Sequence, residues 1–229
     1  LQVTANLIDV VGRLGLQGFK TTALSANRGN RQDGEIRLRG RTENSATQSG
    51  SLLFAGTLDL TAGQITPTTF STFEIAGLVG DSILRTHAPS DGSTSALPLS
   101  AFGEAKLSAD TIEHGGIIRA PFGSLELNAA DKLTLSAGSE LSVSGDGLTV
   151  PVGATVNGTT WFYFPLGTAA GDTFRAITEL PVAKQVLLHA GTLAVAPTAR
   201  VSAAGGGDVQ AAEFISGAGL NFVGNVEGR

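Results

Sequence analysis

Apolar residues recur in pairs with a period of eight residues between positions 125 and 143. The pairs lie in the triplets 125–127 (LEL), 133–135 (LTL) and 141–143 (LSV). In each triplet the outer residues are apolar and the middle residue is polar, which is the two-residue period of a strand with one buried face. Three such strands with their corners make a coil of about 24 residues, so the sequence predicts a β-solenoid whose stacked coils share one core.

The same period predicts where individual side chains point. We expect the outer residues of the three triplets to point into one apolar column. The three middle residues, Glu126, Thr134 and Ser142, should point outward.

Short alternating runs continue through most of the chain. One coil is clear at 57–60, 64–66 and 73–75, and another at 186–202. At about 20 to 25 residues per coil, the chain would hold about nine or ten coils in a rod of about 45 Å. The pattern stops at 88–98, where we expect an extra loop, and again at 150–181, where we expect an extra-helical hairpin excursion.

Composition excludes several classes of partner. The chain has 31 Gly, no Cys and only 15% charged residues, against about 25% in an average globular protein. Its net charge of −5 leaves no basic surface to neutralise phosphates, so we expect no nucleic-acid partner. No apolar run approaches 18 residues, so we expect no membrane insertion. Without Cys, stability must come from stacking.

Three longer segments resemble one protein family. The segments at 56–75, 98–147 and 201–214 are similar to the filamentous haemagglutinin-like exoproteins of two-partner secretion systems. The resemblance implies a right-handed parallel β-helix on a very long secreted protein, located outside the cell or at the cell surface. It also implies export through an outer-membrane secretion partner, by way of parts outside this chain, and a role in adhesion or aggregation.

The ends of the chain also lie in repeat-like sequence. A free-standing solenoid needs a polar cap at each end. Residues 1–229 are therefore expected to form a single β-helix segment of a longer chain.

Candidate catalytic groups are few. Two carboxylates and an imidazole lie within five residues at Asp110, Glu113 and His114, and could serve as acid, base and orienter. Because they flank Ile112 and precede two glycines, we expect them at a solvated solenoid corner, without catalytic function. His87 and His189 are isolated, so no metal or cofactor site is predicted. Gly205–Asp208 contains the glycine-rich calcium pattern only once and is interpreted as a turn.

The nearest equivalent of the carboxylate cluster of β-helical polysaccharide lyases is Glu126, Asp131 and Glu140. The solvated exterior of a single coil is expected to contain this many carboxylates. We therefore expect no enzymatic activity from them.

The excursion after the eight-residue period contains the candidate partner-binding residues. Asn157-Gly158 is the dipeptide favoured in type I′ hairpin turns, and Asn157 also begins a glycosylation sequon. Trp161, Phe162, Tyr163 and Phe164 follow at once. These rings either pack against the solenoid wall or are exposed for contact with a surface glycan or protein.

The sequence therefore favours a non-enzymatic segment of a secreted adhesin-like exoprotein that acts as a rigid stalk. Partners would be host or bacterial surface glycans or proteins. Two alternatives stay open: a carbohydrate-active β-helix enzyme, and a structural solenoid of a phage or surface fibre.

Overall fold

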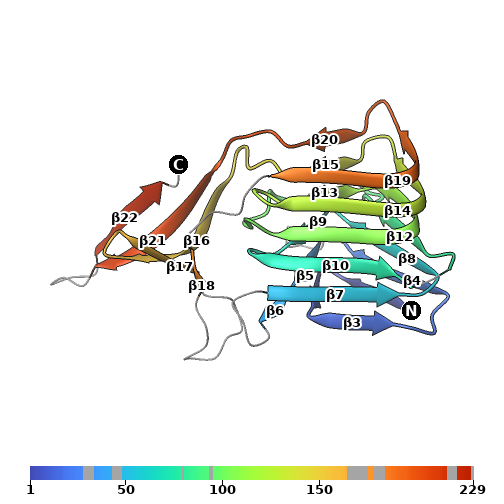
Figure 1. Cartoon of the computed structure of the whole chain (residues 1–229), viewed down its shortest axis with the longest axis horizontal. Coiled ribbons are helices and arrows are strands. Elements are labelled where there is room, and N and C mark those ends of the chain that lie inside the picture. Colours follow the sequence, from blue (N-terminus) through green and yellow to red (C-terminus); the bar gives the residue numbers. More distant parts are fainter. Residues whose placement is uncertain are drawn as a thin grey trace.

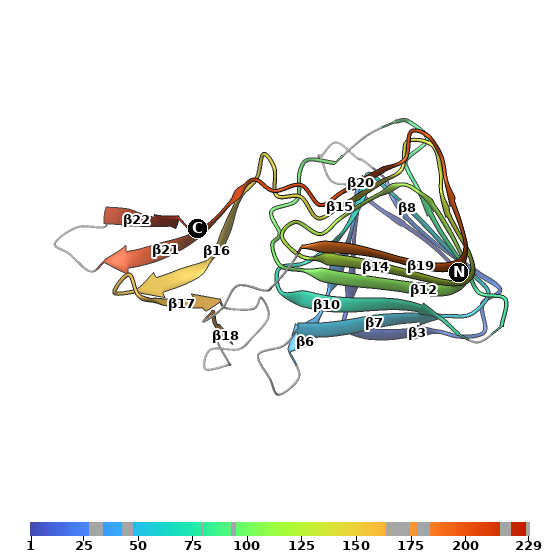
Figure 2. The ribbon, with the colours of Figure 1, turned by 45° about the horizontal axis from the view of Figure 1, so that its top comes forward.

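The computed structural model describes residues 1–27, 34–42, 48–78, 80–92, 95–163, 175–177, 184–215 and 221–227. All the regular secondary structure assigned among these residues is β-strand, so the all-β class predicted from the sequence is confirmed. Most strands run parallel and stack as three ladders around one core (Figures 1 and 2). This stack of parallel strands fits a β-solenoid.

Three sets of strands form the ladders. The first ladder contains β3 (Arg13–Leu16), β7 (Gln48–Phe54), β10 (Ser71–Gly77) and the first parts of β12 (Glu104–Gly115), β14 (Ser124–Leu135) and β19 (Gln185–Val195). The second contains β1 (Gln2–Ala5), β4 (Thr21–Ala26), β8 (Thr57–Ala62), β11 (Ile83–His87) and the second parts of β12, β14 and β19. The third contains β2 (Leu7–Val11), β5 (Glu35–Arg39), β9 (Gln64–Pro67), β13 (Ile117–Arg119), β15 (Glu140–Ser142) and β20 (Arg200–Ser202). β6 (Arg41–Thr42) pairs antiparallel with β7.

Three strands pass around a corner without a turn. β12, β14 and β19 each contribute to two ladders, and the pairing shifts register between Ala109 and Thr111 in β12 and between Ala129 and Lys132 in β14. The triplets at 125–127 and 133–135 are therefore two parts of one bent strand. Alternation alone predicts two separate strands, because it does not show that hydrogen bonding continues through the register shift.

The predicted apolar column is present. The outer residues of the three triplets are at most 1% exposed and belong to one core cluster with residues of all three ladders. Glu126 and Thr134 are partly exposed, as expected for the outer surface. Ser142 is the exception, because it is only 7% exposed. It points to the outer side of β15, as predicted, but lies in a groove that neighbouring segments wall off.

A second, smaller core forms outside the column at the corner before the first ladder. Phe70, Phe102 and Phe122 precede β10, β12 and β14, and all three have positive φ, at 55°, 61° and 57°. Ser71 N donates to Thr68 O and Gly123 N donates to Ala120 O, so Phe70 and Phe122 each occupy the third position of a turn that normally favours glycine. The ring centroids of Phe70 and Phe102 are 5.1 Å apart, and those of Phe102 and Phe122 are 5.9 Å apart. We call these three rings the phenylalanine stack.

A separate sheet packs against the phenylalanine stack. It contains β16 (Thr149–Val156), β17 (Thr160–Tyr163), β18 (Arg175–Ala176), β21 (Asp208–Ile215) and β22 (Asn221–Glu227), and it lies to one side of the ladders (Figure 1). β16 and β17 form an antiparallel hairpin, and Asn157 and Gly158 in its turn have φ of 53° and 62°. The hairpin predicted from this dipeptide is therefore confirmed. β21, from the following coil, pairs parallel with β16.

The segment between β11 and β12 crosses the outside of the third ladder. In its described part, residues 88–92 and 95–103, no strand is assigned, and β9 pairs directly with β13. Gln64 Nε2 donates to Ala96 O at 2.9 Å, and Ser100 Oγ donates to Pro67 O at 2.7 Å. We call residues 95–103 the strap; beneath it, every residue of β9 is buried.

The column makes a direct prediction about Leu133. Leu133→Asp would leave an unpaired carboxylate in the core and should reduce the free energy of unfolding by about 3–5 kcal/mol. Thr134→Asp, on the outer side of the same strand, is the matched control and should have little effect. Circular dichroism and chemical denaturation measure both variants. Equal stability of the two would show that Leu133 is not in the core.

Candidate functional site

The carboxylates and imidazole predicted as a possible constellation do not face one another. Asp110 accepts hydrogen bonds from the backbone N and the hydroxyl of Ser82, both at 2.7 Å, and these bonds lower the pKa of its carboxyl. Glu113 points outward and pairs with Arg85 at 2.7 Å. His114 is 0% exposed. Two of the three groups thus lie on the outside of the ladder and the third lies inside.

The prediction that His114 is solvated at a corner is wrong, because the two-residue period places it on the same side of β12 as buried Ile112. Its Nε2 lies 3.1 Å from Glu140 O and its Nδ1 lies 2.7 Å from the Thr86 hydroxyl. A carbonyl oxygen only accepts, so Nε2 carries the proton and Nδ1 accepts from Thr86. Burial lowers the pKa of His114 to about 4, which keeps the ring neutral in the core.

The three carboxylates compared with a lyase cluster lie on different sides of the molecule. Glu126 is on the first ladder, where it accepts from Asn128 at 2.7 Å and lies 3.5 Å from Lys106. Asp131 is exposed at the bend of β14. Glu140 is on the third ladder and pairs with Arg119 at 3.0 Å. They therefore do not converge on one substrate position.

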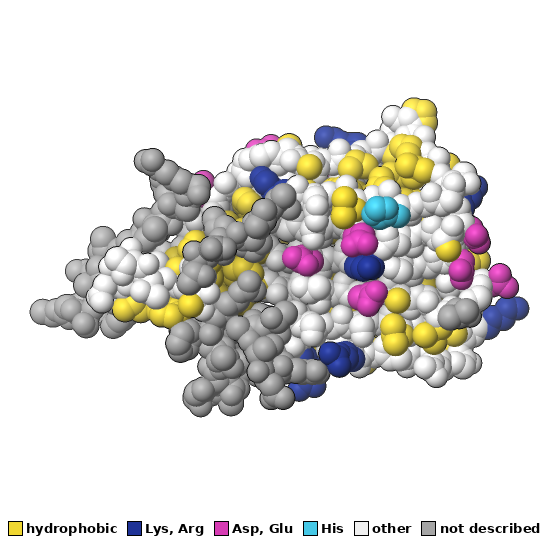
Figure 3. All heavy atoms as spheres, viewed as in Figure 1, with side chains coloured by type: hydrophobic (Ala, Val, Ile, Leu, Met, Phe, Trp, Pro, Cys, Tyr) yellow, Lys and Arg dark blue, Asp and Glu magenta, His cyan; other side chains and the backbone are white. Residues whose placement is uncertain are grey.

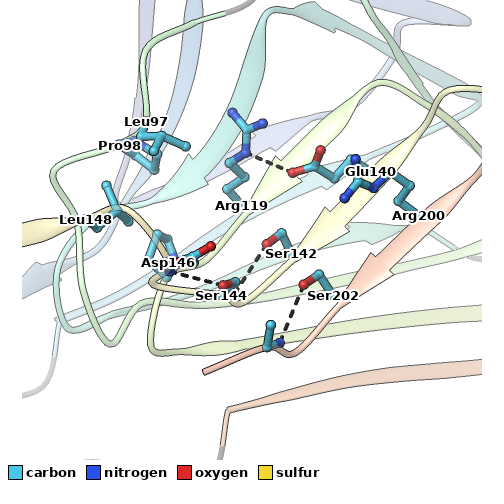
Figure 4. A pocket seen from close by; sticks show the side chains of 12 residues that line it. Leu97, Pro98, Arg119, Glu140, Ser142, Ser144, Asp146, Leu148, Arg200 and Ser202 are labelled. Atoms are coloured by element: carbon cyan, nitrogen blue, oxygen red, sulfur yellow. Dashed lines mark hydrogen bonds and ion pairs between the residues drawn. The ribbon is translucent and has the colours of Figure 1, made fainter. Parts of the chain in front are cut away.

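A polar groove lies on the outer surface of the third ladder (Figure 4). It has a volume of about 280 Å³, and its floor comes from β13, β15 and β20. One wall is Leu97 and Pro98 of the strap, and the other is the segment after β15, which includes Asp146 and Leu148. The register places Glu140 opposite Ile117 on one side and Arg200 on the other, so side chains of three successive coils meet in this groove.

Charged and hydroxyl groups alternate across the groove. Arg119 donates to Glu140 and, at 3.1 Å, to Gln64 Oε1, so this pair is held in place. The Arg200 side chain is not in a hydrogen bond or ion pair with any described residue. It is therefore the charged donor that a ligand in the groove could engage.

Three serines give the groove oriented hydroxyls. Ser142 Oγ accepts from Ser144 N at 3.3 Å, Ser144 Oγ accepts from Asp146 N at 3.1 Å, and Ser202 Oγ accepts from Ala204 N at 3.5 Å (Figure 4). Because each hydroxyl already accepts one bond, its own proton remains available for donation. Hydroxyl donors, carboxylate acceptors and an apolar rim suit a polyhydroxylated ligand such as a saccharide.

The strap has a second hollow on its other side. This hollow has a volume of about 360 Å³ and extends from Thr66 of β9 and Thr68, which follows β9, to Tyr163 of the hairpin. Leu99 of the strap is 71% exposed at its border. The strap thus divides the outer surface of the third ladder into two neighbouring depressions.

Two of the aromatic residues predicted as partner-binding residues, Trp161 and Tyr163, pack against other parts of the protein. Trp161 Nε1 donates to Val152 O at 2.6 Å, and Trp161 and Tyr163 pack against the second core. The Tyr163 ring centroid lies 5.0 Å from that of Phe70. Phe162 is partly buried and Asn157 is exposed, while Phe164 lies outside the described residues. Partner binding by this group stays a prediction, but the rings of Trp161 and Tyr163 contribute to packing.

The phenylalanine stack and the groove were not predicted from the sequence. A signal for the stack existed, because Phe precedes Ser or Gly just before a strand at Phe70, Phe102 and Phe122. The groove had no such signal. Its walls come from the strap and from the segment after β15, which are far from β20 in sequence.

The sequence matches no protein-family model, and no curated protein or solved structure matches it. Within the described ranges, no three His, Asp or Glu side chains are placed to hold a metal ion. None of the described segments forms a helix with the length and apolar character needed to span a bilayer.

The buried imidazole predicts a pH dependence. His114 has a pKa of about 4 in the fold and an ordinary value of 6.5, so the unfolded chain binds more protons between these values. Stability from this group is present above pH 6.5 and is lost as the pH falls toward 4, by about 3 kcal/mol. Urea denaturation at pH 7 and pH 4.5 measures the loss.

His114→Gln should remove this contribution, whereas His189→Gln, at an exposed position of β19, should keep it. The same pH dependence in wild type and His114→Gln would contradict the burial of a neutral imidazole.

The packing of the aromatic residues predicts a loss of stability. The double variant Trp161→Ala with Tyr163→Ala should be destabilised by about 3 kcal/mol or more, because it removes large side chains from the second core. Val156→Ala, at a 51% exposed position of the same hairpin, is the control. Thermal melts compare the melting temperatures of the double variant and the control. An unchanged melting temperature of the double variant would contradict the packing.

Proposed function

We propose that the chain is a rigid, adhesive segment of a large secreted bacterial exoprotein of the filamentous haemagglutinin-like type. The β-helix is the stalk, and adhesion or aggregation is its role. Export through an outer-membrane partner and an extracellular or cell-surface location are parts of this proposal. The chain itself has no catalytic role in it.

One observation carries the proposal: a single apolar core runs through every coil from β2 to β15. Outside this core, ion pairs connect neighbouring coils, namely Asp9 with Arg37, Arg85 with Glu113, and Arg119 with Glu140. Each exposed pair adds little on its own, but together they align successive coils. A one-dimensional stack of this kind supports a spacer function.

The right-handed sense of the β-helix and its number of coils are also parts of this proposal. The right-handed sense is what the family resemblance implies. The third ladder has six strands among the described residues, whereas the mean coil length predicts about nine or ten coils. The strap and the side sheet use residues that this estimate assigned to coils.

The walls support a spacer with a localised contact site. The face in Figure 3 is mostly uncharged, with acidic and basic side chains in a short line across the ladder. Lys106 of β12 and Glu126 of β14, which are paired in the first ladder, lie 3.5 Å apart. Flat walls with small polar side chains offer few binding anchors. The groove at Arg200, with its donors and acceptors, is the better contact site for a surface glycan.

A bead-adhesion assay tests this function. Beads coated with the 229-residue chain should bind cells and immobilised glycans saturably. Arg200→Ser should weaken glycan binding about tenfold by removing a charged hydrogen bond. Lys132→Ser, at an exposed position on the bend of β14, should not.

Two results would contradict the proposal. Absence of saturable binding by the wild type would reject an adhesive role. Turnover of a polysaccharide that Glu140→Gln abolished would favour the carbohydrate-active enzyme instead.

A further inference from the structure

A hydroxyl group beneath the strap has no hydrogen-bond partner among the described residues. Thr66 of β9 is 3% exposed and lines the hollow of about 360 Å³ beside the strap. Its Oγ1 neither donates to nor accepts from any group in the described part of the chain. A buried hydroxyl without a partner costs free energy in the fold. A ligand that brings hydroxyl groups into the hollow can supply the missing bond.

Two other side chains in the hollow are suited to the hydroxyl groups of a ligand. Thr69 Oγ1 accepts from Ala101 N at 3.3 Å, so its own proton remains available for donation. Ser100 Oγ donates to Pro67 O at 2.7 Å, so its lone pairs remain available for acceptance. Both residues line the hollow, which therefore offers a donor and an acceptor in fixed positions.

The strap gives the hollow an apolar wall. Leu97 and Leu99 are 46% and 71% exposed, and both line the hollow together with Tyr163. The Tyr163 ring is held in place against Phe70, with the centroids 5.0 Å apart. A sugar ring carries hydroxyl groups at its edge and C–H groups on its faces. It therefore matches a cavity that combines a few placed polar groups with an apolar wall.

The charges in the hollow favour an uncharged ligand. Among the described residues that line it, the charged ones are Glu35 and Arg37. Arg37 donates to the Asp9 carboxylate through two hydrogen bonds of 2.6 and 2.9 Å, and Glu35 accepts from Gln64 Nε2. Because these charges are balanced and already engaged, the hollow has little electrostatic preference for an anion or a cation.

A polar network beneath the strap connects the hollow with the groove. Gln64 is 0% exposed; its Nε2 donates to Glu35 in the hollow, and its Oε1 accepts from Arg119 in the groove at 3.1 Å. Leu97 and Pro98 line both depressions, and Figure 4 shows them at the edge of the groove. The groove and the hollow thus share a wall, and their polar groups are connected.

We propose that the hollow is a second saccharide subsite, and that one uncharged glycan chain occupies both depressions by crossing the strap at Leu97 and Pro98. This inference rests on the glycan contact proposed above and specifies its ligand as a neutral chain of several sugar units. Thr66 and Thr69 bind hydroxyl groups of the sugar in the hollow, and Leu99 packs against its ring face. The groove at Arg200 binds a neighbouring part of the same chain.

A pair of isosteric substitutions tests the subsite. Thr66→Val removes the unpartnered hydroxyl but keeps the shape of the side chain. Thr22→Val is the matched control, because Thr22 is 0% exposed, its Oγ1 also has no partner among the described residues, and it lines neither depression. Neither substitution removes a hydrogen bond of the fold, so both variants should melt at the wild-type temperature or above it.

A glycan array probed with a concentration series of the 229-residue chain measures the binding. Its probes are single hexoses, longer neutral chains, and chains that carry uronic acid or sulfate groups. The wild type and Thr22→Val should bind longer neutral chains better than single hexoses. Thr66→Val should bind the same chains about five- to tenfold more weakly, which is the effect of one hydrogen bond.

A second pair of variants tests the apolar wall. Leu99→Ser should also weaken the binding of longer neutral chains, because it removes the side chain that packs against the sugar ring. Val156→Ser, at a 51% exposed position of the hairpin, is the control and should bind like the wild type. Circular dichroism and thermal melts first establish that both variants are folded.

Other outcomes overturn the proposal. Equal binding by Thr66→Val and Thr22→Val, with a loss only in Arg200→Ser, would reject the subsite and leave the groove as the contact site. A preference for acidic chains would reject a neutral ligand, and equal binding of single hexoses and longer chains would reject a shared chain. If no glycan bound but coated beads still adhered to cells, the subsite would be rejected and the adhesive role kept. Failure of both assays would reject the proposed function itself.

Discussion

The structure depends on one constraint: inward side chains must repeat at the same register from coil to coil. A parallel ladder keeps each apolar residue on top of its counterpart, so Leu107, Leu127 and Leu188 form a column although up to 81 residues separate them in the chain. No coil could bury this surface alone. The polar residue His114 lies in this core with both ring nitrogens in hydrogen bonds, to Thr86 and Glu140. Burial of the ring disfavours its charged form and lowers its pKa, so the ring remains neutral.

The corners and the outer walls do not have to satisfy that constraint. The features that distinguish this protein from a plain stack of coils are located there. At one corner, Phe70, Phe102 and Phe122 adopt a backbone conformation that is unfavourable for a bulky residue, at about 1–3 kcal/mol each. The unfavourable backbone directs the rings outward, where they stack on one another and on Tyr163. The side sheet buries this stack. On the third ladder, the strap crosses the wall and creates the groove. Additions of this kind change the surface of a solenoid without disturbing its core.

The sequence predicted what depends on local pattern and missed what depends on register over long distances. Strict alternation at 125–143 identified the core residues, and Asn157-Gly158 identified a hairpin, because both signals are complete within a few residues. The bend of β14 was missed because a register shift leaves the alternation on each side intact. His114 was misplaced because its two glycine neighbours outweighed its spacing from Ile112. The side sheet was missed because β21 pairs with β16, more than 50 residues earlier, and neither segment alone indicates the other. Ser142 and Arg200 came together in the groove through coil stacking, which composition does not reveal.

Hydrogen exchange measured strand by strand tests the account most directly. The 229-residue chain should be studied at a dilution at which it is monomeric. Amides in β12 and β14, which have partner strands on both sides, should be the most protected, and protection should decrease through β10 and β7 toward β3, and from β14 to β19. Equal protection in all ladders, or stronger protection in β1–β3 and β19–β20 than in β12 and β14, would contradict a stability that arises from stacked, register-matched coils.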